Sequence, residues 1–277
     1  MFKTHRLLKI IGIVIVVIVA GAAVAVKLVM NPLLFSFDGK GVPAIVASPM
    51  KVSDIYLISK FRSEEGHDFS TMAWDGESCR SLKHYFNTSM NVNDHNLPVR
   101  SQPSPGHPNI AIYAPFDGKI TEIDQEKVPI GQQIHFASAQ NSSYFVILFH
   151  TDPLPSLHVG SFVKGGDQIG TVGPMDGIDV AYEAYIMPNF KIVYLSIFDY
   201  MTDSAFAPFA ALGYKRSDFI LTRTQADAGG YKCNGEQFTN QPLMNPGSPN
   251  PDMEVDLRPN PWVAIYDQQH HIGTSPH

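Results

Sequence analysis

The histidines and cysteines of this sequence are the side chains best suited to metal binding or catalysis, and their spacing excludes several common sites. The sequence has eleven histidines and two cysteines. No histidine stands in an H-E-x-x-H pair, and the cysteines lack the C-x-x-C spacing of a two-thiolate metal site. There is no G-x-S-x-G nucleophile elbow. The acidic residues are scattered, so no carboxylate pair for glycoside hydrolysis is marked.

The elements that must position any site are short strands, and three strings are the most informative. They read "APFDGKI" from Ala114, "FVILFHT" from Phe145 and "VGSFVKGGDQIGTVG" from Val159. Apolar alternation broken by Gly and Asp turns predicts a small antiparallel sheet, and Asp117-Gly118 predicts a hairpin. The order of these strings resembles the peptidase M23 family, also called the LytM or lysostaphin-type domain. Its members are zinc endopeptidases that cut peptidoglycan cross-bridges.

The resemblance implies a mainly β fold, an M23-like antiparallel β-sandwich or barrel-sandwich with short helical additions. Biotinyl and lipoyl carriers and glucose-permease IIA domains use similar strings. A biotinyl or lipoyl carrier needs a lysine at a hairpin tip, and neither Lys119 nor Lys164 sits in such a tip with its flanking residues intact. We therefore favour the M23-like interpretation over a carrier domain.

The family's first zinc motif, H-x-G-x-D, maps onto the segment from Glu64 to Asp68. Gly66 and Asp68 match, but Glu64 stands where the first ligand histidine belongs. His67 is adjacent, and it replaces the missing ligand only if the backbone bends, because neighbouring side chains on a strand point to opposite faces. The resemblance thus implies Asp68, Glu64 and His67 as candidate metal ligands.

The family's second motif, H-x-H-[FY]-E, maps onto the segment from Asp179 to Glu183. Asp179 replaces the catalytic histidine, and Ala181 replaces a zinc ligand. His150 falls at a further active-site histidine, so the resemblance implies His150 and Asp179 as candidate catalytic residues. The remaining set would be three carboxylates and one imidazole, from Glu64, Asp68, Asp179 and His150. Such a set suits a harder cation, or none, better than catalytic zinc. We expect no cofactor, with zinc or another divalent cation as the alternative.

The N-terminus predicts export of the remaining chain. Residues 10–26 are unbroken apolar sequence behind Lys3, Arg6 and Lys9, which favours a single-pass anchor with the bulk of the chain extracytoplasmic. A cleaved signal peptide is the alternative, because Ala23-Val24-Ala25 is a small-x-small site. In an exported chain we expect Cys79 and Cys233 to form a disulfide. The formal net charge of -6 and the lack of a second basic cluster argue against nucleic acid binding.

We divide the chain into four parts by composition. Residues 1–30 are the anchor or signal segment, 31–54 a lead-in linker, 55–215 the M23-like β domain with an insertion at about 87–109, and 216–277 a C-terminal extension that is partly rich in Pro and Asn. Within the β domain we expect a short helix over 78–86 and a helix over 198–214, broken at Pro208.

The sequence therefore predicts a membrane-anchored, M23-like cell-envelope protein of a divergent subfamily that lacks the H-x-H motif. We expect this protein to bind a peptidoglycan-like peptide or an envelope protein, without catalysis or with altered catalysis. The alternative is a zinc metalloendopeptidase of the cell wall with a substituted ligand set. A third class is a structural extracytoplasmic subunit with no small ligand.

Overall fold

The computed structural model describes residues 39–88, 110–126, 130–175, 177–186, 191–235, 237–239 and 262–265, together with residues 15, 19, 21, 22 and 37. The strands are β1 (Leu57–Ser59), β2 (His84–Asn87), β3 (Ala111–Tyr113), β4 (Gly118–Gln125), β5 (Gln132–Ser138), β6 (Tyr144–Pro153), β7 (Phe162–Val163), β8 (Gln168–Val172), β9 (Gly177–Ile186), β10 (Lys191–Leu195) and β11 (Trp262–Ala264). The helices are α2 (Ile197–Tyr200), α3 (Asp203–Ala211) and α4 (Arg223–Ala228), with 3-10 turns η2 (Val52–Asp54) and η3 (Arg216–Phe219).

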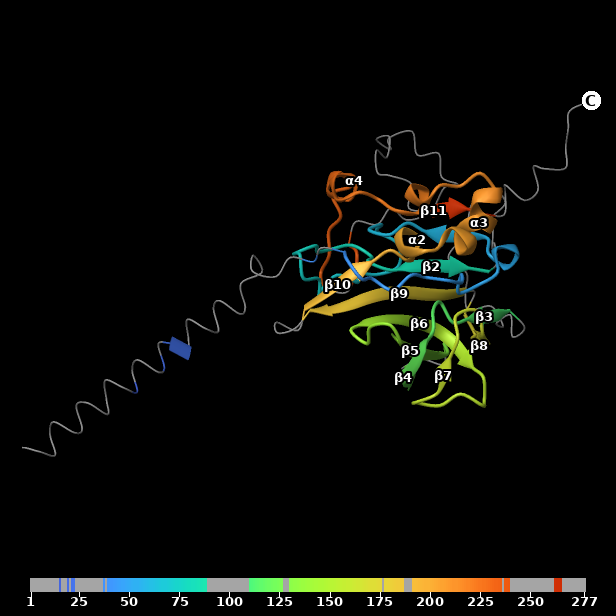
Figure 1. The fold of residues 1–277 in the computed structure, drawn as a ribbon. Helices are drawn as coiled ribbons and strands as arrows, with labels where there is room; N and C mark the ends of the chain where they lie inside the picture. Colours follow the sequence, from blue (N-terminus) through green and yellow to red (C-terminus); the bar gives the residue numbers. More distant parts are fainter. Residues whose placement is uncertain are drawn as a thin grey trace, which may run out of the picture.

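Antiparallel pairing joins these strands into one sheet. Its main path runs β11-β1-β2-β9-β6-β5-β4-β7, with β10 paired to β9 and β8 paired to both β3 and β6. In Figure 1 the helices α2 and α3 lie beside β2 and β11, and β4, β5 and β7 lie at the opposite side of the domain. The mainly β prediction is confirmed.

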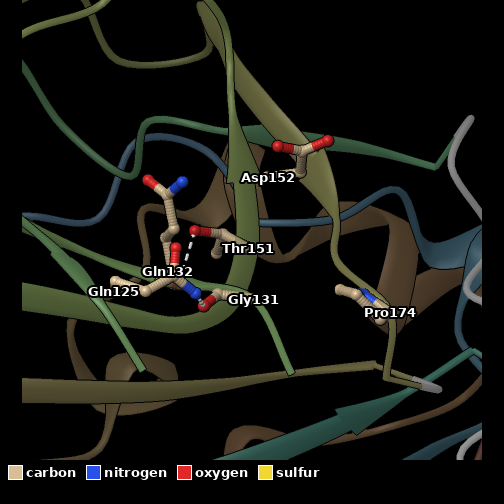
Figure 2. A pocket seen from close by; sticks show the side chains of 6 residues that line it. All are labelled: Gln125, Gly131, Gln132, Thr151, Asp152 and Pro174. Carbon is tan, nitrogen blue, oxygen red and sulfur yellow. Dashed lines mark hydrogen bonds between the residues drawn. The ribbon is translucent and has the colours of Figure 1, made fainter. Parts of the chain in front are cut away.

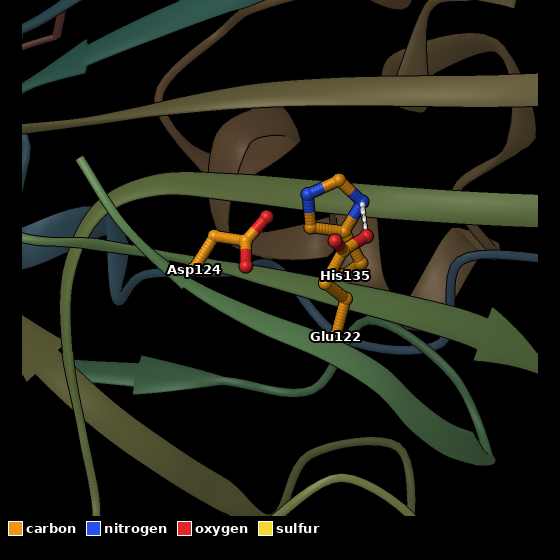
Figure 3. A group of neighbouring side chains, drawn as sticks. All are labelled: Glu122, Asp124 and His135. Carbon is orange, nitrogen blue, oxygen red and sulfur yellow. Dashed lines mark ion pairs between the residues drawn. The ribbon is translucent and has the colours of Figure 1, made fainter. Parts of the chain in front are cut away.

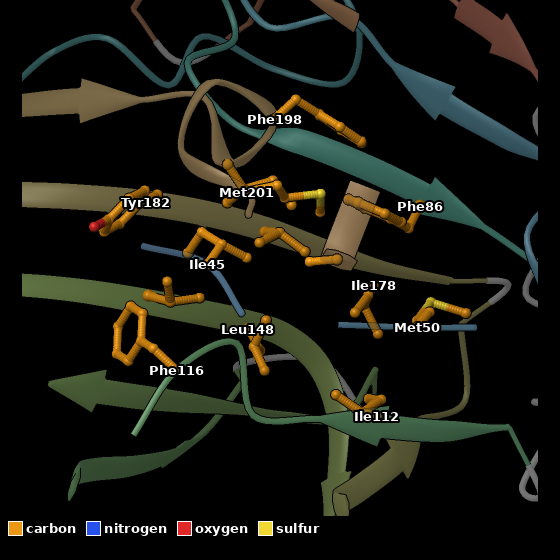
Figure 4. Close-up of a cluster of buried hydrophobic side chains, with 14 of the residues drawn as sticks. Ile45, Met50, Phe86, Ile112, Phe116, Leu148, Ile178, Tyr182, Phe198 and Met201 are labelled. Carbon is orange, nitrogen blue, oxygen red and sulfur yellow. The ribbon is translucent and has the colours of Figure 1, made fainter. Parts of the chain in front are cut away.

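The long strands β6 and β9 present two distinct faces because side chains alternate along a strand. Ile178, Val180 and Tyr182 of β9 join the main hydrophobic core. Figure 4 shows side chains of this core between β9, β6 and the segment before β1. The intervening residues of β9, Asp179, Ala181 and Glu183, lie on the opposite face of the sheet and are also buried.

The segment 61–82 lies against that second face. Its backbone bonds to the edge of β10, where Ile192 donates to the carbonyl of Met72 at 2.9 Å. Phe61, Ala73 and Leu82 form a small separate apolar cluster, with the partly buried Tyr194 of β10 packed against it. Polar side chains of the second face are consequently enclosed between the sheet and this segment.

Three local predictions are wrong. Residues 84–87 form strand β2 instead of a helix, because the alternate side chains His84 and Phe86 are buried and pairing with β1 and β9 overrides local propensity. Asp117-Gly118 does not close a hairpin, since β3 pairs with β8 while β4 pairs with β5 and β7. The helix over 198–214 is two helices, and the break lies at Thr202, which caps α3, while Pro208 is inside α3.

The predicted disulfide is confirmed. Cys79 and Cys233 are bonded across a sequence separation of 154 residues, which ties the segment 61–82 to the C-terminal part of the chain. The apolar N-terminal run falls almost entirely outside the described residues, as do residues 89–109 of the predicted insertion. In the part of the chain that the structure describes, no helix is long and apolar enough to cross a membrane.

Candidate functional site

The candidate site lies on the second face of the sheet, where β2 runs beside β9. Tyr85 of β2 stands opposite Asp179 of β9. Lys83 precedes β2 and shares the face of Tyr85, so the strand delivers its side chain to Asp179 across the pair. The Lys83 Nζ lies 2.7 Å from Asp179 Oδ2, and the Lys83 side chain is only 2% exposed.

Aromatic rings enclose the ammonium group of Lys83. Its Nζ lies 4.7 Å from the ring centroid of Phe69, 4.9 Å from that of Tyr85 and 4.7 Å from that of Phe149. The negative face of an aromatic ring attracts a cation, and this attraction strengthens when water is excluded. Phe69 comes from the segment 61–82, whereas Tyr85 and Phe149 come from the sheet, so the ammonium is held between the two layers.

His150 reaches Asp179 from the other side because β6 carries a bulge. Gln132 pairs with Thr151 and Ile134 with Leu148, so Phe149 and His150 together stand opposite one residue of β5. His150 has a φ of 61°, a left-handed conformation that the bulge accommodates. Its Nε2 lies 3.3 Å from Asp179 Oδ2, and its Nδ1 lies 2.9 Å from Glu126 Oε2.

Two glycines make room for this bulge. A Cβ at Gly131 would lie 2.8 Å from the carbonyl carbon of His150, and one at Gly173 would lie 2.7 Å from its carbonyl oxygen. Gly173 also donates its backbone N–H to that oxygen at 2.8 Å. The glycine that ends the string "IGTVG" therefore fixes the backbone that aims His150 at Asp179.

The side chains form a row of alternating charge, which we call the Lys83 cluster: Lys83, Asp179, His150 and Glu126. Burial lowers the pKa of Lys83, but Asp179 and Tyr85 together outweigh burial and the net pKa is raised. Burial likewise opposes the charge of His150, yet Asp179 and Glu126 raise its pKa to about 9. Burial would raise the pKa of Asp179, and Lys83 and His150 instead hold it well below its usual range. Lys83 and His150, the two neighbours of the Asp179 carboxylate, are therefore both positively charged at neutral pH.

His67 closes the other end of the row. Gly66 has a φ of 71°, and a Cβ there would lie 2.0 Å from the Tyr85 hydroxyl, so the backbone bends next to this ring. The bend brings His67 Nε2 to 3.1 Å from Lys83 Nζ. His67 Nδ1 lies 3.1 Å from the carbonyl oxygen of Asp68, which can only accept, so Nδ1 carries the proton and Nε2 accepts from Lys83.

The side chain of Asp68 serves the turn that follows it. Its Oδ1 accepts the backbone N–H of Ser70 at 3.0 Å and that of Arg80 at 3.2 Å, and it also contacts the Ser70 hydroxyl. Glu64 is buried in the same segment. The structure thus places His67 and Asp179 against the Lys83 ammonium and His150 against the Asp179 carboxylate, while the Asp68 backbone carbonyl meets the His67 ring.

Two further positions of β9 complete this face. Ala181 is fully buried opposite Ile147 of β6. Glu183 lies opposite Phe145 of β6 and Tyr194 of β10, and only 3% of it is exposed. Burial raises the pKa of Glu183 to about 7. Among the described residues no side chain forms a hydrogen bond or ion pair with its carboxyl group.

A pocket of about 270 Å³ lies beside the backbone of the bulge. Figure 2 shows its lining side chains, with Thr151 and Gln132 next to each other and Asp152 and Pro174 on the far side. The Thr151 hydroxyl donates to the Gln132 carbonyl at 2.8 Å. The lining residues are Gln125, Gly131, Gln132, Thr151, Asp152 and Pro174.

Sequence reasoning missed two members of the Lys83 cluster. Lys83 stands between Leu82 and His84, and all three residues are buried, so the sequence shows no alternation that would set Lys83 apart. A buried lysine needs a carboxylate partner, but its burial follows from the strand pairing. Glu126 follows β4 by one residue, and its contact with His150 depends on how β5 and β6 pair. Nothing in the local sequence around Glu126 carries that information.

No protein-family model matches the sequence, and no curated protein matches it. Solved structures do show similarity. A zinc containing peptidase from Vibrio cholerae has 16% identity over 55% of this chain and 39% of its own, with a TM-score of 0.33. Csd3 from Helicobacter pylori has 15% identity over 58% and 36%, with a TM-score of 0.37. The antimicrobial peptidase lysostaphin from Staphylococcus simulans has 14% identity over 70% and 65%, with a TM-score of 0.36. This chain spans less than two thirds of each.

Proposed function

We propose that this chain is a divergent M23-like cell-envelope protein whose domain binds a peptidoglycan-like peptide or an envelope protein without cleaving it. One observation carries the proposal. The buried ammonium of Lys83 occupies the space between His67 and Asp179, where the M23 resemblance of the two motif segments calls for a metal ion. The cation of this site is supplied by the chain itself.

A metal ion and the Lys83 ammonium exclude each other. A doubly charged ion about 3 Å from the ammonium would be repelled by on the order of 10 kcal/mol, even at an effective dielectric constant near 20. A catalytic zinc also needs three protein ligands and an open position for water. Ala181 offers no ligand atom, and the His67 Nε2 lone pair is engaged by Lys83.

The alternative of a zinc peptidase with substituted ligands is disfavoured by the same contacts. Asp68 is the family ligand that the sequence retains, and its Oδ1 accepts the backbone N–H groups of Ser70 and Arg80. Asp179 is held by Lys83 and His150 through Oδ2. A metal ion at either carboxylate would have to compete with these partners.

The pocket beside the bulge is the place where we propose that a peptide binds. The carboxamides of Gln125 and Gln132 can both donate and accept, which suits the amide groups of a peptide backbone, and Asp152 adds a carboxylate for a cationic group. We further propose that residues 10–26 anchor the protein in a membrane, with the pocket on the extracytoplasmic side. Carbonate extraction of membranes tests the anchor, because an anchored chain stays in the pellet and a cleaved form is released.

Co-sedimentation of the purified full-length protein with insoluble peptidoglycan tests the binding proposal. We expect the wild-type protein to pellet and Gln132→Ala to pellet several-fold less. Gln140→Ala is the matched control, since Gln140 is exposed and lies outside the pocket. Release of new free amino groups from the peptidoglycan would show a peptidase. Absence of pelleting would leave the structural-subunit class as the better description.

A further inference from the structure

A group of side chains that could ligate a metal ion lies on strands β4 and β5. Strand β4 has a bulge between Ile120 and Glu122, and after it Glu122 stands opposite His135 of β5 while Asp124 stands opposite Gln133. Glu122 and Asp124 are two residues apart, so both side chains leave the same face of β4. His135 shares that face as the cross-strand partner of Glu122.

The three side chains converge on one point. One ligand atom from each of Glu122, Asp124 and His135 lies within 4.8 Å of the others. Figure 3 shows the two carboxylates on either side of the imidazole ring of His135. Glu122 and Asp124 are exposed, whereas His135 is partly buried.

A chain of hydrogen bonds outside the group sets the tautomer of His135. The Glu126 carboxylate can only accept, so the Gln133 amide nitrogen donates to it, at 3.5 Å. That orientation aims the Gln133 carbonyl oxygen at His135 Nε2, 3.4 Å away, and Nε2 must then carry the proton. The lone pair of the ring is therefore on Nδ1. Histidine ligands of metals are commonly oriented in this way by a partner of their other nitrogen.

The Nδ1 lone pair faces a carboxylate oxygen without a proton between them. Nδ1 lies 3.7 Å from Glu122 Oε2, so two acceptors point at each other. A cation between the three groups removes this conflict.

We propose that Glu122, Asp124 and His135 form a binding site for a borderline divalent cation such as Zn²⁺ or Co²⁺. One imidazole and two carboxylates are a ligand set that these ions accept. Three protein ligands leave at least one coordination position, which water or a carboxylate of a bound partner can fill. The site shares no ligand with the Lys83 cluster and is joined to it only through Gln133 and Glu126, so it stands whether or not the proposed function does.

Titration of the purified full-length protein with Co²⁺, followed by visible absorption, and with Zn²⁺, followed by calorimetry, tests this site. We expect one ion per chain at this position, and His135→Ala should weaken its binding by on the order of tenfold or more. Glu122→Gln provides a milder variant at an exposed position. Gln133→Leu should also weaken binding, because it releases the tautomer of His135.

His158→Ala is the matched control, since His158 is an exposed histidine in a loop outside this group. It should leave the titration unchanged. The sequence also ends in a tail with His270, His271 and His277, which can bind ions by themselves. If neither ion binds, or if the bound ion is insensitive to His135→Ala and Glu122→Gln, the proposed site does not exist.

Discussion

Asp179 and Glu183 carry two carboxyl groups on the same face of β9, four residues apart. Both are buried, but they differ in their neighbours and in the direction of their pKa shifts. Asp179 is 6% exposed and Glu183 is 3% exposed. Asp179 lies between Lys83 and His150, and its pKa is held well below the usual range. Glu183 lies against Phe145 and Tyr194, and burial raises its pKa to about 7. Burial thus disfavours the charged form of both carboxyl groups, and the presence or absence of cationic partners decides the direction of the net pKa shift.

The difference shows how a sheet face accommodates a buried carboxyl group with cationic partners and without them. At Asp179 the chain provides two cations of its own, and the charges of the Lys83 cluster alternate without a metal. At Glu183 no described cation is near, and the carboxyl group approaches neutrality instead. We therefore expect substitutions at the two positions to change stability in opposite directions.

The largest effect is expected from Lys83→Met, which keeps the length of the side chain and removes its charge. Removing one partner of a buried ion pair leaves the other uncompensated, which typically costs about 3–5 kcal/mol. Urea unfolding at pH 7 measures this loss. Lys83→Met combined with Asp179→Asn should be more stable than Lys83→Met alone. If the double variant is no more stable than the single one, the two charges are not coupled as described.

Glu183→Gln should have an effect of opposite sign. The pKa of Glu183 rises on folding from 4.5 to about 7, so the cost of its charge to folding stability is absent below pH 4.5 and complete above pH 7. The variant should therefore be more stable than the wild type by roughly 3 kcal/mol at pH 8. At pH 4 the two proteins should unfold at the same urea concentration. A variant that is less stable at pH 8 would show that Glu183 has a favourable partner.

A smaller effect is expected from His150→Gln. The pKa of His150 rises on folding from 6.5 to about 9, so its contribution is complete below pH 6.5 and is lost as the pH rises through 9. The ring is 18% exposed, which reduces the contribution to about 1–3 kcal/mol. Thermal unfolding between pH 6 and pH 10 should show a fall for the wild type and a flatter profile for the variant. Equal slopes would place the titration elsewhere.

The sequence predicted the class of fold because alternation and Gly-Asp turns are local signals. It did not predict strand β2 over residues 84–87, because that segment is decided by pairing with β1 and β9, which are distant in the chain. The sequence predicted a helix break at Pro208, but the break lies at Thr202. The side chain of Thr202 accepts the N–H of Ala205 and caps the new helix α3.

The candidate site was predictable only where a motif marked it. The motif segments pointed to His67 and Asp179, and the string "FVILFHT" pointed to His150. The structure places the first two against Lys83 and His150 against Asp179. The same segments suggested Asp68 as a metal ligand, but its carboxylate caps a local turn, an alternative that short polar side chains commonly take. Lys83 and Glu126 reach the site through strand pairing, so no local pattern identifies them.

The zinc content and peptidase activity of the His135→Ala protein test most directly whether Lys83 takes the place of a metal ion. This variant lacks the metal site proposed on β4 and β5, so any zinc at the Lys83 cluster can be measured without interference from that site. After equilibration with zinc and dialysis, we expect no zinc whose retention depends on Asp179, and no cleavage of glycyl or cross-bridge peptides. One zinc per chain that Asp179→Asn removes, together with hydrolysis that the same substitution abolishes, would contradict the proposal that Lys83 replaces the metal.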